Sequence, residues 1–105
     1  MNDPGSDFSE GKECWVLIFD GRSFRGRTLG IVGEVKMEKI IVDGIDWSGE
    51  LDSVMVGRRA RVKYFSEKKF KGRERTLLPG VQEENINRIP FGNQMRSLKT
   101  ECVTE

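Results

Sequence analysis

The densest group of side chains that could do chemistry is basic and lies within residues 58–75. This segment holds nine Lys or Arg residues against two Glu residues. Such a row of cations can bind phosphate-rich polymers, because each contact releases counterions, and Tyr64 could stack on a base. The alternative is a solvated strand and hairpin balanced by acids elsewhere, and the net charge of only +1 favours this alternative over nucleic-acid binding. The candidates for polyanion binding are Arg58, Arg59, Arg61, Lys63, Lys68, Lys69 and Lys71.

Histidine is absent from the 105 residues. Its absence excludes histidine-dependent acid–base catalysis, Ser–His and Cys–His nucleophile pairs, and histidine-ligated zinc or iron from within this chain. We therefore predict that the protein is not an enzyme and has no small-molecule substrate.

The two cysteines, Cys14 and Cys102, stand near opposite ends of the expected folded region. They lack the Cys-x-x-Cys spacing of redox and zinc sites. We interpret them as two reduced thiols at strand ends. A disulfide between the first and last strands stays open as an alternative, because it depends on whether the two α-carbons come within bridging distance.

Length and composition fit one globular domain with a modest core, since 36% of residues are apolar and 33% are charged. We place this domain at residues 13–103. Residues 1–12 are acidic and contain Gly and Ser, so they are predicted to form a disordered lead-in. They lack the basic start and apolar segment of a secretory signal, and the longest apolar runs are too short to cross a bilayer. We therefore expect a cytoplasmic protein without a membrane span.

An internal repeat organises this domain. FDGRSFRG, residues 19–26, and FSEKKFKG, residues 65–72, share two aromatics and a glycine at the same spacing, 46 positions apart. Further along each half, IDWSGELDSV aligns with IPFGNQMRSL at an offset of 44 positions. The matching blocks keep their order and nearly their spacing, which indicates two copies of one structural unit, at about 14–57 and 58–102.

Each copy is predicted to consist of short strands separated by turns. A segment rich in β-formers opens each copy and is followed by a polar turn, a Phe-x-Gly-Arg sequence and a second strand. The expected strands are 15–19, 27–32 and 51–57 in the first copy and 60–65, 73–78 and 95–101 in the second. The predicted fold is all-β, a two-sheet Greek-key sandwich of about eight antiparallel strands.

The repeated motif resembles that of the βγ-crystallins. Their unit has an aromatic, four residues, a second aromatic, one residue and a glycine in a folded-over hairpin, and later a serine that ties the hairpin down. The matching positions are Phe19, Phe24, Gly26 and Ser53 in the first copy and Phe65, Phe70, Gly72 and Ser97 in the second. The resemblance covers about residues 14–102 and implies one βγ-crystallin-like domain of two Greek-key motifs. These residues are expected to hold the fold, because the second aromatic covers the hairpin and the serine bonds main-chain groups.

The resemblance also raises calcium binding. The family's signature is similar to two Asn/Asp residues, two free positions, a Ser/Thr and the structural serine, and calcium takes about 6–8 oxygen ligands. Residues 48–53 and 92–97 keep the serine but lose much of this set, so the resemblance implies lost or weak calcium binding. Arg96 stands where an oxygen ligand is needed and could instead pair with a carboxylate to brace the loops. The remaining candidate ligands are Glu50, Asp52, Ser66 from the opposite hairpin, and Asn93.

The resemblance implies a non-enzymatic structural module valued for stability, with either no cofactor or weakly bound Ca²⁺. Two alternatives stay open. One is a calcium-binding domain with a single surviving site, and the other is a module that binds a protein or a polyanion through the basic stripe 58–75. The expected partners are another protein or the neighbouring domains of a larger chain.

Overall fold

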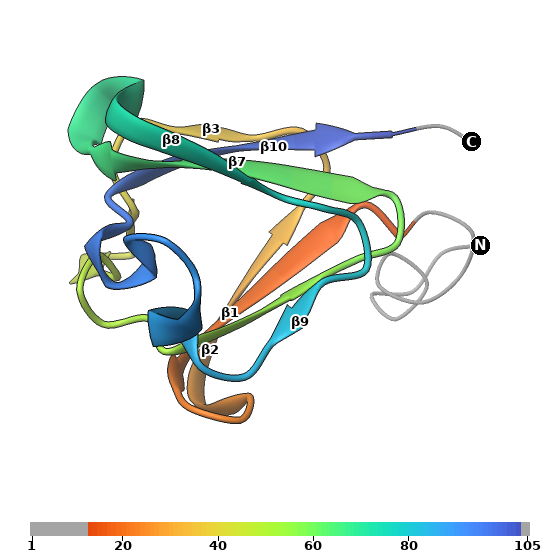
Figure 1. Ribbon diagram of the computed structural model, residues 1–105, viewed down its shortest axis with the longest axis horizontal. Coiled ribbons are helices and arrows are strands. Elements are labelled where there is room, and N and C mark those ends of the chain that lie inside the picture. The colour runs from red at the N-terminus through yellow and green to blue at the C-terminus, as the bar shows by residue number, and fades with distance from the viewer. Residues whose placement is uncertain (1–12, 104–105) are drawn as a thin grey trace.

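Eight strands form two four-stranded antiparallel sheets in the computed structural model, which describes residues 13–103 (Figure 1). The first sheet has the spatial order β2 (Arg25–Val32), β1 (Trp15–Gly21), β6 (Ser53–Val56) and β9 (Gln82–Glu83). The second has the order β3 (Lys36–Met37), β10 (Ser97–Cys102), β7 (Ala60–Glu67) and β8 (Lys71–Leu77). The predicted all-β, two-sheet sandwich of about eight strands is confirmed. The predicted disordered lead-in, residues 1–12, lies outside the described residues.

Shorter elements complete the chain. A two-stranded ribbon is formed by β4 (Ile41–Val42) and β5 (Ile45–Asp46), and three 3₁₀ turns follow later, η1 (Lys68–Phe70), η2 (Ile86–Arg88) and η3 (Gly92–Gln94). None of the helical turns in the described part of the chain is long and apolar enough to cross a membrane.

Each repeat donates one strand to the sheet of the other repeat. The short strand β3 follows β1 and β2 in the chain but pairs with β10, and β9 follows β7 and β8 but pairs with β6. A single repeat therefore cannot complete either sheet, and the two repeats bury one shared apolar face.

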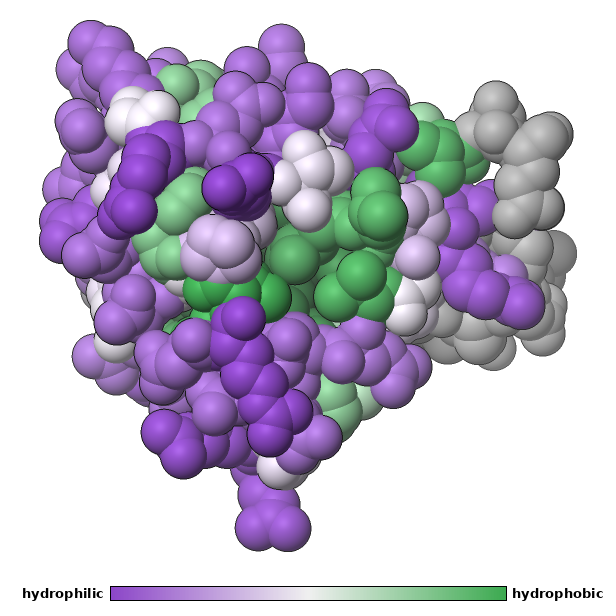
Figure 2. Space-filling model, viewed as in Figure 1, coloured by the Kyte–Doolittle hydropathy of each residue, from purple (hydrophilic) through white to green (hydrophobic). Residues whose placement is uncertain are grey.

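The core lies between the sheets and is built from equivalent positions of both repeats. Period-two alternation sends Val62 and Tyr64 of β7 and Leu98 of β10 inward, each at most 1% exposed. Ile40 and Ile86, which are 46 positions apart, are both fully buried. Figure 2 shows a mainly hydrophilic surface in which apolar side chains gather near the centre of the face in view.

A buried serine ties down the folded-over hairpin of each repeat. Ser53 Oγ accepts a hydrogen bond from the Phe24 N–H at 3.0 Å and donates one to the Gly21 carbonyl at 2.5 Å. In the second repeat, Ser97 Oγ accepts from the Phe70 N–H at 3.0 Å and donates to the Glu67 carbonyl at 2.6 Å. Both serines are 0% exposed, so the two bonds satisfy groups that water does not reach.

The hairpins need this support because their backbone is strained. Phe24 and Phe70 both have a φ of 61°, in the left-handed region that costs a non-glycine residue free energy. In return, each ring packs edge-on against the first aromatic of its motif, with ring centroids 5.7 Å apart for Phe19 and Phe24 and 5.6 Å apart for Phe65 and Phe70. The strained backbone of each hairpin is therefore stabilised by the contact between the two aromatic rings and by one buried hydroxyl.

A glycine is required where each hairpin backbone turns. Gly26 and Gly72 have φ values of 84° and 81°. A Cβ at Gly26 would also meet Asp20 Oδ1, and one at Gly72 would meet Ser66 Oγ. Both the backbone conformation and the lack of space therefore exclude larger residues.

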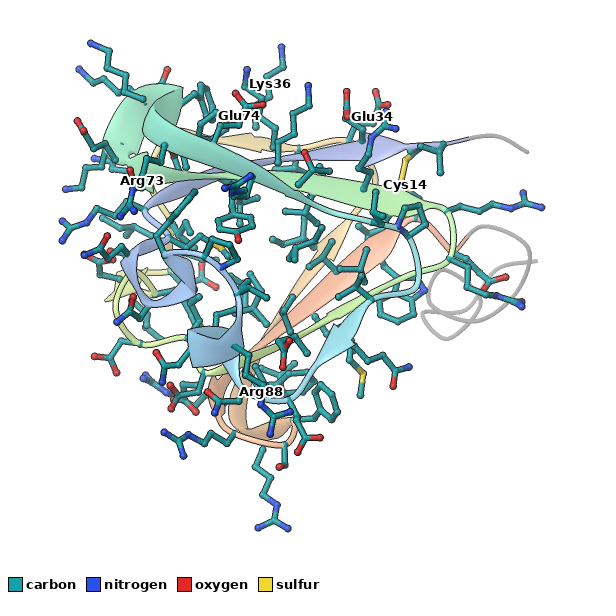
Figure 3. The ribbon with its side chains drawn as sticks, viewed as in Figure 1. Cys14, Glu34, Lys36, Arg73, Glu74 and Arg88 are labelled. Carbon is teal, nitrogen blue, oxygen red and sulfur yellow. A yellow bond between two sulfur atoms is a disulfide. The ribbon has the colours of Figure 1, made fainter. Side chains whose placement is uncertain are left out.

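The interpretation of the two cysteines as reduced thiols is wrong. Cys14 and Cys102 form a disulfide across 88 positions, with α-carbons 5.4 Å apart (Figure 3). The interpretation failed because the distance between the two strand ends is a property of the fold, and the sequence does not reveal it. The bridge fixes the start of the first repeat to the end of the second.

Removing either tying serine should destabilise the fold. Ser53→Ala and Ser97→Ala each leave a buried N–H and a buried carbonyl without partners, which should lower the free energy of unfolding by about 2–4 kcal/mol. Denaturant unfolding would measure the loss. Ser23→Ala is the control, since the Ser23 side chain is exposed and lies 3.5 Å from Glu84 Oε1, and it should change stability by less than about 0.5 kcal/mol. Equal effects of the buried and exposed substitutions would contradict the assigned role.

Opening the disulfide should lower stability without changing the fold. A bridge across 88 positions gives about 4.6 kcal/mol in the chain-entropy account. The variant Cys14→Ser/Cys102→Ser should therefore unfold at a lower denaturant concentration than the oxidised protein. A reducing agent should lower the thermal midpoint of the oxidised protein and leave that of the variant unchanged. If the midpoint of the original protein is the same with and without the reductant, the bridge does not form.

Candidate functional site

The loop that precedes the last strand of each repeat, within residues 48–53 or 92–97, lies against the hairpin of the same repeat. We call it the closing loop. The Asp52 N–H donates to the Phe19 carbonyl at 2.8 Å, and the Arg96 N–H donates to the Phe65 carbonyl at 2.9 Å. The loops contain Glu50, Asp52 and Asn93, and the second hairpin contains Ser66, so the structure defines two equivalent sites, one between each loop and its hairpin.

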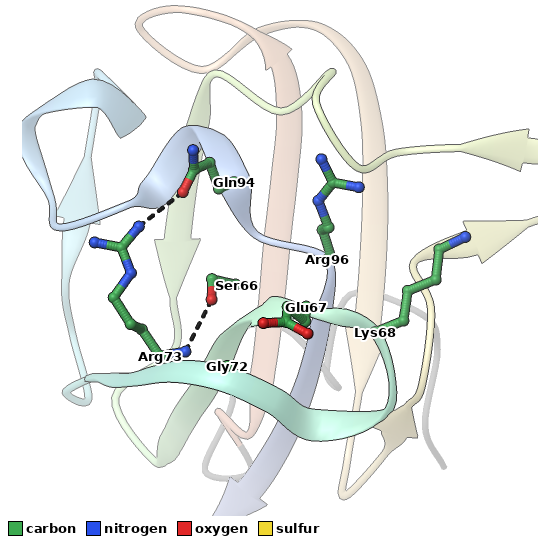
Figure 4. A pocket seen from close by; sticks show the side chains of 7 residues that line it. All are labelled: Ser66, Glu67, Lys68, Gly72, Arg73, Gln94 and Arg96. Atoms are coloured by element: carbon green, nitrogen blue, oxygen red, sulfur yellow. Dashed lines mark hydrogen bonds between the residues drawn. The ribbon is translucent and has the colours of Figure 1, made fainter.

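In the second repeat this site is an open pocket of about 750 Å³ (Figure 4). Its lining residues are Ser66, Glu67, Lys68, Gly72, Arg73, Gln94 and Arg96. The lining therefore carries three cations and one carboxylate. Ser66 lies beside the closing loop of its own repeat. This placement gives no support to a calcium site that Ser66 would share with Glu50 and Asp52.

Arg73 donates hydrogen bonds to two oxygen atoms of this pocket. Its backbone N–H donates to Ser66 Oγ at 2.8 Å, and its Nη2 donates to Gln94 Oε1 at 2.8 Å. The same guanidinium lies over the Phe91 ring, 4.6 Å from its centroid. The hairpin and the closing loop of the second repeat are thus joined by one side chain of the protein itself.

The first repeat has the same arrangement around Arg27. Its N–H donates to Asp20 Oδ1 at 2.7 Å, its Nε donates to Asp20 Oδ2 at 2.6 Å, and its Nη2 lies 3.8 Å from Glu50 Oε1. The guanidinium lies 5.4 Å from the centroid of the Trp47 ring. Asp20 therefore plays the part that Ser66 plays in the second repeat, and Glu50 faces a fixed cation.

The sequence analysis missed these two arginines. The Phe-x-Gly-Arg pattern marked Arg27 and Arg73 as equivalent, but their role depends on contacts with residues about 20 positions away along the chain. Trp47 and Phe91 were noticeable only as aligned aromatics. Each copy has an arginine and an aromatic at equivalent positions, and this repeated pair was the sequence signal that could have predicted the contact.

Unlike Arg27, Arg96 forms no ion pair with a described carboxylate, and its charge acts only weakly on Asp46. Asp46 Oδ1 accepts hydrogen bonds from both Ser48 N–H and Ser48 Oγ, and these bonds are the main reason that the pKa of Asp46 is lowered. Lys68 and Arg96 lower it further by charge. Within the described residues no carboxylate comes within ion-pair distance of Arg96, so its proposed pairing stays a prediction.

The remaining calcium candidates are not gathered into a recognisable centre. Asn93 is exposed in η3, and Asp52 is half-buried. Over residues 13–103, no group of three or more His, Cys, Asp or Glu side chains is placed to hold a metal ion. Calcium binding by Glu50, Asp52, Ser66 or Asn93 stays a prediction.

Two arginines of the basic segment 58–75 are paired with carboxylates. Arg58 forms two hydrogen bonds with Glu13, at 2.8 and 2.9 Å, and Arg61 pairs with Glu101 at 3.0 Å. The idea that Tyr64 stacks on a base is wrong, because its side chain is 1% exposed and its hydroxyl donates to the Pro90 carbonyl. Because side chains alternate between the two faces of β7, the Tyr64 side chain points into the core. Polyanion binding by the other residues of the segment stays a prediction.

The pairing of Asp20 with Arg27 should be visible in a titration. The Arg27 side chain holds the pKa of Asp20 below its ordinary value of about 4. Because the folded-state pKa is lowered, the pairing stabilises the protein above the ordinary pKa, and this stabilisation is lost as the pH falls through the folded-state pKa. Arg27→Gln should raise the pKa of Asp20 and lower the thermal midpoint at pH 7 but not at the lowest pH.

NMR titration of the side-chain carboxyl groups measures this pKa. Asp46 is the internal control, because its pKa is lowered mainly by Ser48 and should be the same in both proteins. An unchanged Asp20 pKa in Arg27→Gln would refute the pairing.

No protein-family model and no curated protein sequence matches this chain. Solved structures do match it. A structure concerned with the evolution of the eye lens βγ-crystallin domain fold has a TM-score of 0.73 and 18% identity, covering 88% of this chain and 89% of its own. The N-terminal domain of protein S has a TM-score of 0.68 and 17% identity, covering 88% and 100%.

A βγ-crystallin from Ciona intestinalis has a TM-score of 0.63 and 21% identity, covering 83% of this chain and 99% of its own. These similarities extend over nearly the whole described region, and they agree with the tandem hairpin motifs and their tying serines. The chain has the βγ-crystallin fold.

Proposed function

We propose that this chain is a non-enzymatic structural module of the βγ-crystallin type that keeps its fold without calcium. The observation that carries the proposal is the pair of arginines. In each repeat a guanidinium joins the hairpin to the closing loop, the two segments that carry the candidate ligands. The protein thus supplies from its own side chains the link that a bound ion would otherwise make.

The charges around the second site oppose a divalent cation, and in the first repeat Arg27 already lies beside the carboxylates of Asp20 and Glu50. Calcium requires several oxygens, including carboxylates, and a fixed guanidinium nearby repels it. In the second repeat Arg73 already occupies two oxygen atoms, and Arg96 and Lys68 line the same pocket. In the first repeat Glu50 lies beside Arg27. We therefore expect calcium binding to be absent or of about millimolar affinity.

The proposal includes no catalytic role, since the chain lacks histidine and the described pocket contains no nucleophile paired with a base. Possible partners are another protein or neighbouring domains. The predicted cytoplasmic location conflicts with the disulfide, because disulfides persist mainly in oxidising compartments. We infer that the protein works in an oxidising environment.

Thermal unfolding in millimolar calcium, in millimolar magnesium and in chelator tests the proposal. A ligand that binds only the native state adds RT ln(1 + [L]/Kd) to the stability. A micromolar site would add about 4 kcal/mol and raise the midpoint by roughly 15 °C or more. We expect a calcium-specific rise of less than about 3 °C, the value for a millimolar site. A large rise would replace the proposal with the calcium-binding alternative.

The same experiment on Arg73→Ala asks whether the arginine provides the link. Loss of the aromatic contact and the hydrogen bond should lower the free energy of unfolding by about 1 kcal/mol in chelator. Arg25→Ala, which removes an exposed arginine from the other hairpin, is the matched control and should have little effect. Equal stability of the two variants would remove the support that Arg73 gives to the proposal.

A further inference from the structure

Three lysines stand side by side across the outer face of the second sheet. The register pairs Lys36 of β3 with Lys99 of β10, and Lys99 with Lys63 of β7. Their neighbours along the strands, Leu98 and Tyr64, are buried in the core, so alternation directs these lysines outward. We call Lys36, Lys99 and Lys63 the lysine row. Figure 3 shows the Lys36 side chain projecting from this outer face.

The lysine row is electrostatically unfavourable as it stands. Directly opposed residues on neighbouring strands have their Cβ atoms about 4.5–5.5 Å apart, and like charges at such positions destabilise a sheet. Here the central lysine has a like charge on both sides. A protein that keeps such an arrangement carries a local conflict of the kind that is usually found where something binds.

The carboxylates near the lysine row are engaged elsewhere. The row lines a pocket of about 610 Å³ together with Glu34 and Glu101. Glu101 pairs with Arg61 at 3.0 Å, and Glu34 Oε2 accepts the Cys102 N–H at 3.1 Å. Among residues 13–103 no carboxylate forms an ion pair with any of the three lysines, although Glu34 and Glu101 line the same pocket.

Lys99 is held in place at the middle of the row. Its ammonium lies 4.5 Å from the centroid of the Phe70 ring and 5.7 Å from that of Phe65. These are the two aromatics of the folded hairpin, which the buried Ser97 hydroxyl fixes. The row therefore sits on a rigid part of the fold, which reduces the cost of ordering it around a ligand.

We propose that the lysine row is a binding site for a short chain of phosphate groups. Adjacent strands are about 4.8 Å apart, so the backbone positions of the three paired lysines span about 10 Å across the sheet. A linear anion with several negative groups can neutralise all three, whereas a single small anion cannot reach both ends. Lysine suits this ligand because its ammonium is a compact charge that needs no planar alignment with phosphate oxygens.

This site differs from the predicted basic segment. Only Lys63 belongs to residues 58–75, and the other two lysines come from strands that are distant in sequence. The proposal is also independent of the calcium question, since the lysine row lies on the outer face of the sheet and shares no residue with the pocket lined by Arg73 and Arg96.

Inorganic tripolyphosphate is the probe, with no divalent cation added and at an ionic strength of about 0.01 M, where exposed charges are screened least. We expect a saturable rise in the thermal midpoint and NMR shifts confined to β3, β10 and β7. Lys63→Gln should weaken the affinity for tripolyphosphate about fivefold, which is the change in the dissociation constant expected when one strong exposed ion pair is lost. The same variant should raise the midpoint of the ligand-free protein, because it removes the repulsion on both sides.

Arg25→Gln is the matched control, since it removes one positive charge from an exposed position on the other sheet. It should leave tripolyphosphate binding within about twofold of the original, since its distance from the row makes the interaction screened and weak. Equal losses in Lys63→Gln and Arg25→Gln would overturn the proposal in favour of general charge attraction. Orthophosphate that binds as well as tripolyphosphate would also overturn it, as would lysine-row-dependent binding of single-stranded DNA without binding of tripolyphosphate.

Discussion

The rest of this structure depends on one buried hydroxyl in each repeat. The hairpin after the first strand folds back through consecutive left-handed residues, and this turn leaves a main-chain N–H and a carbonyl pointing inward. Ser53 and Ser97 satisfy both groups from the closing strand of the same repeat. The first and last strands of a repeat are thereby connected, and the second aromatic is held over the first.

The tied hairpin also decides where the charged side chains lie. It brings the residue after the turn glycine, Arg27 or Arg73, over the aromatic that precedes the closing strand. A positive charge therefore occupies the space between hairpin and loop in both repeats. In the first repeat this charge lies beside the carboxylates of Asp20 and Glu50, and in the second repeat it lies beside the Gln94 side-chain oxygen.

Two links hold the repeats to each other. The exchanged strands β3 and β9 give each sheet one strand from the other repeat, and the disulfide between Cys14 and Cys102 joins the chain ends of the domain covalently. On the outer face of the second sheet, Lys36, Lys99 and Lys63 occupy directly paired positions of neighbouring strands.

The sequence by itself determined the repeat, the strands that open and close each copy and the all-β class, because alternation and turn residues act over a few positions. The inward direction of Tyr64 was also available from that alternation, although it was overlooked. Tertiary structure alone decided that Cys14 reaches Cys102, that Arg73 lies on Phe91 and that Lys36, Lys99 and Lys63 are neighbours. Each of these contacts joins segments far apart in the chain, and strand order and register set their distances, which no local pattern encodes.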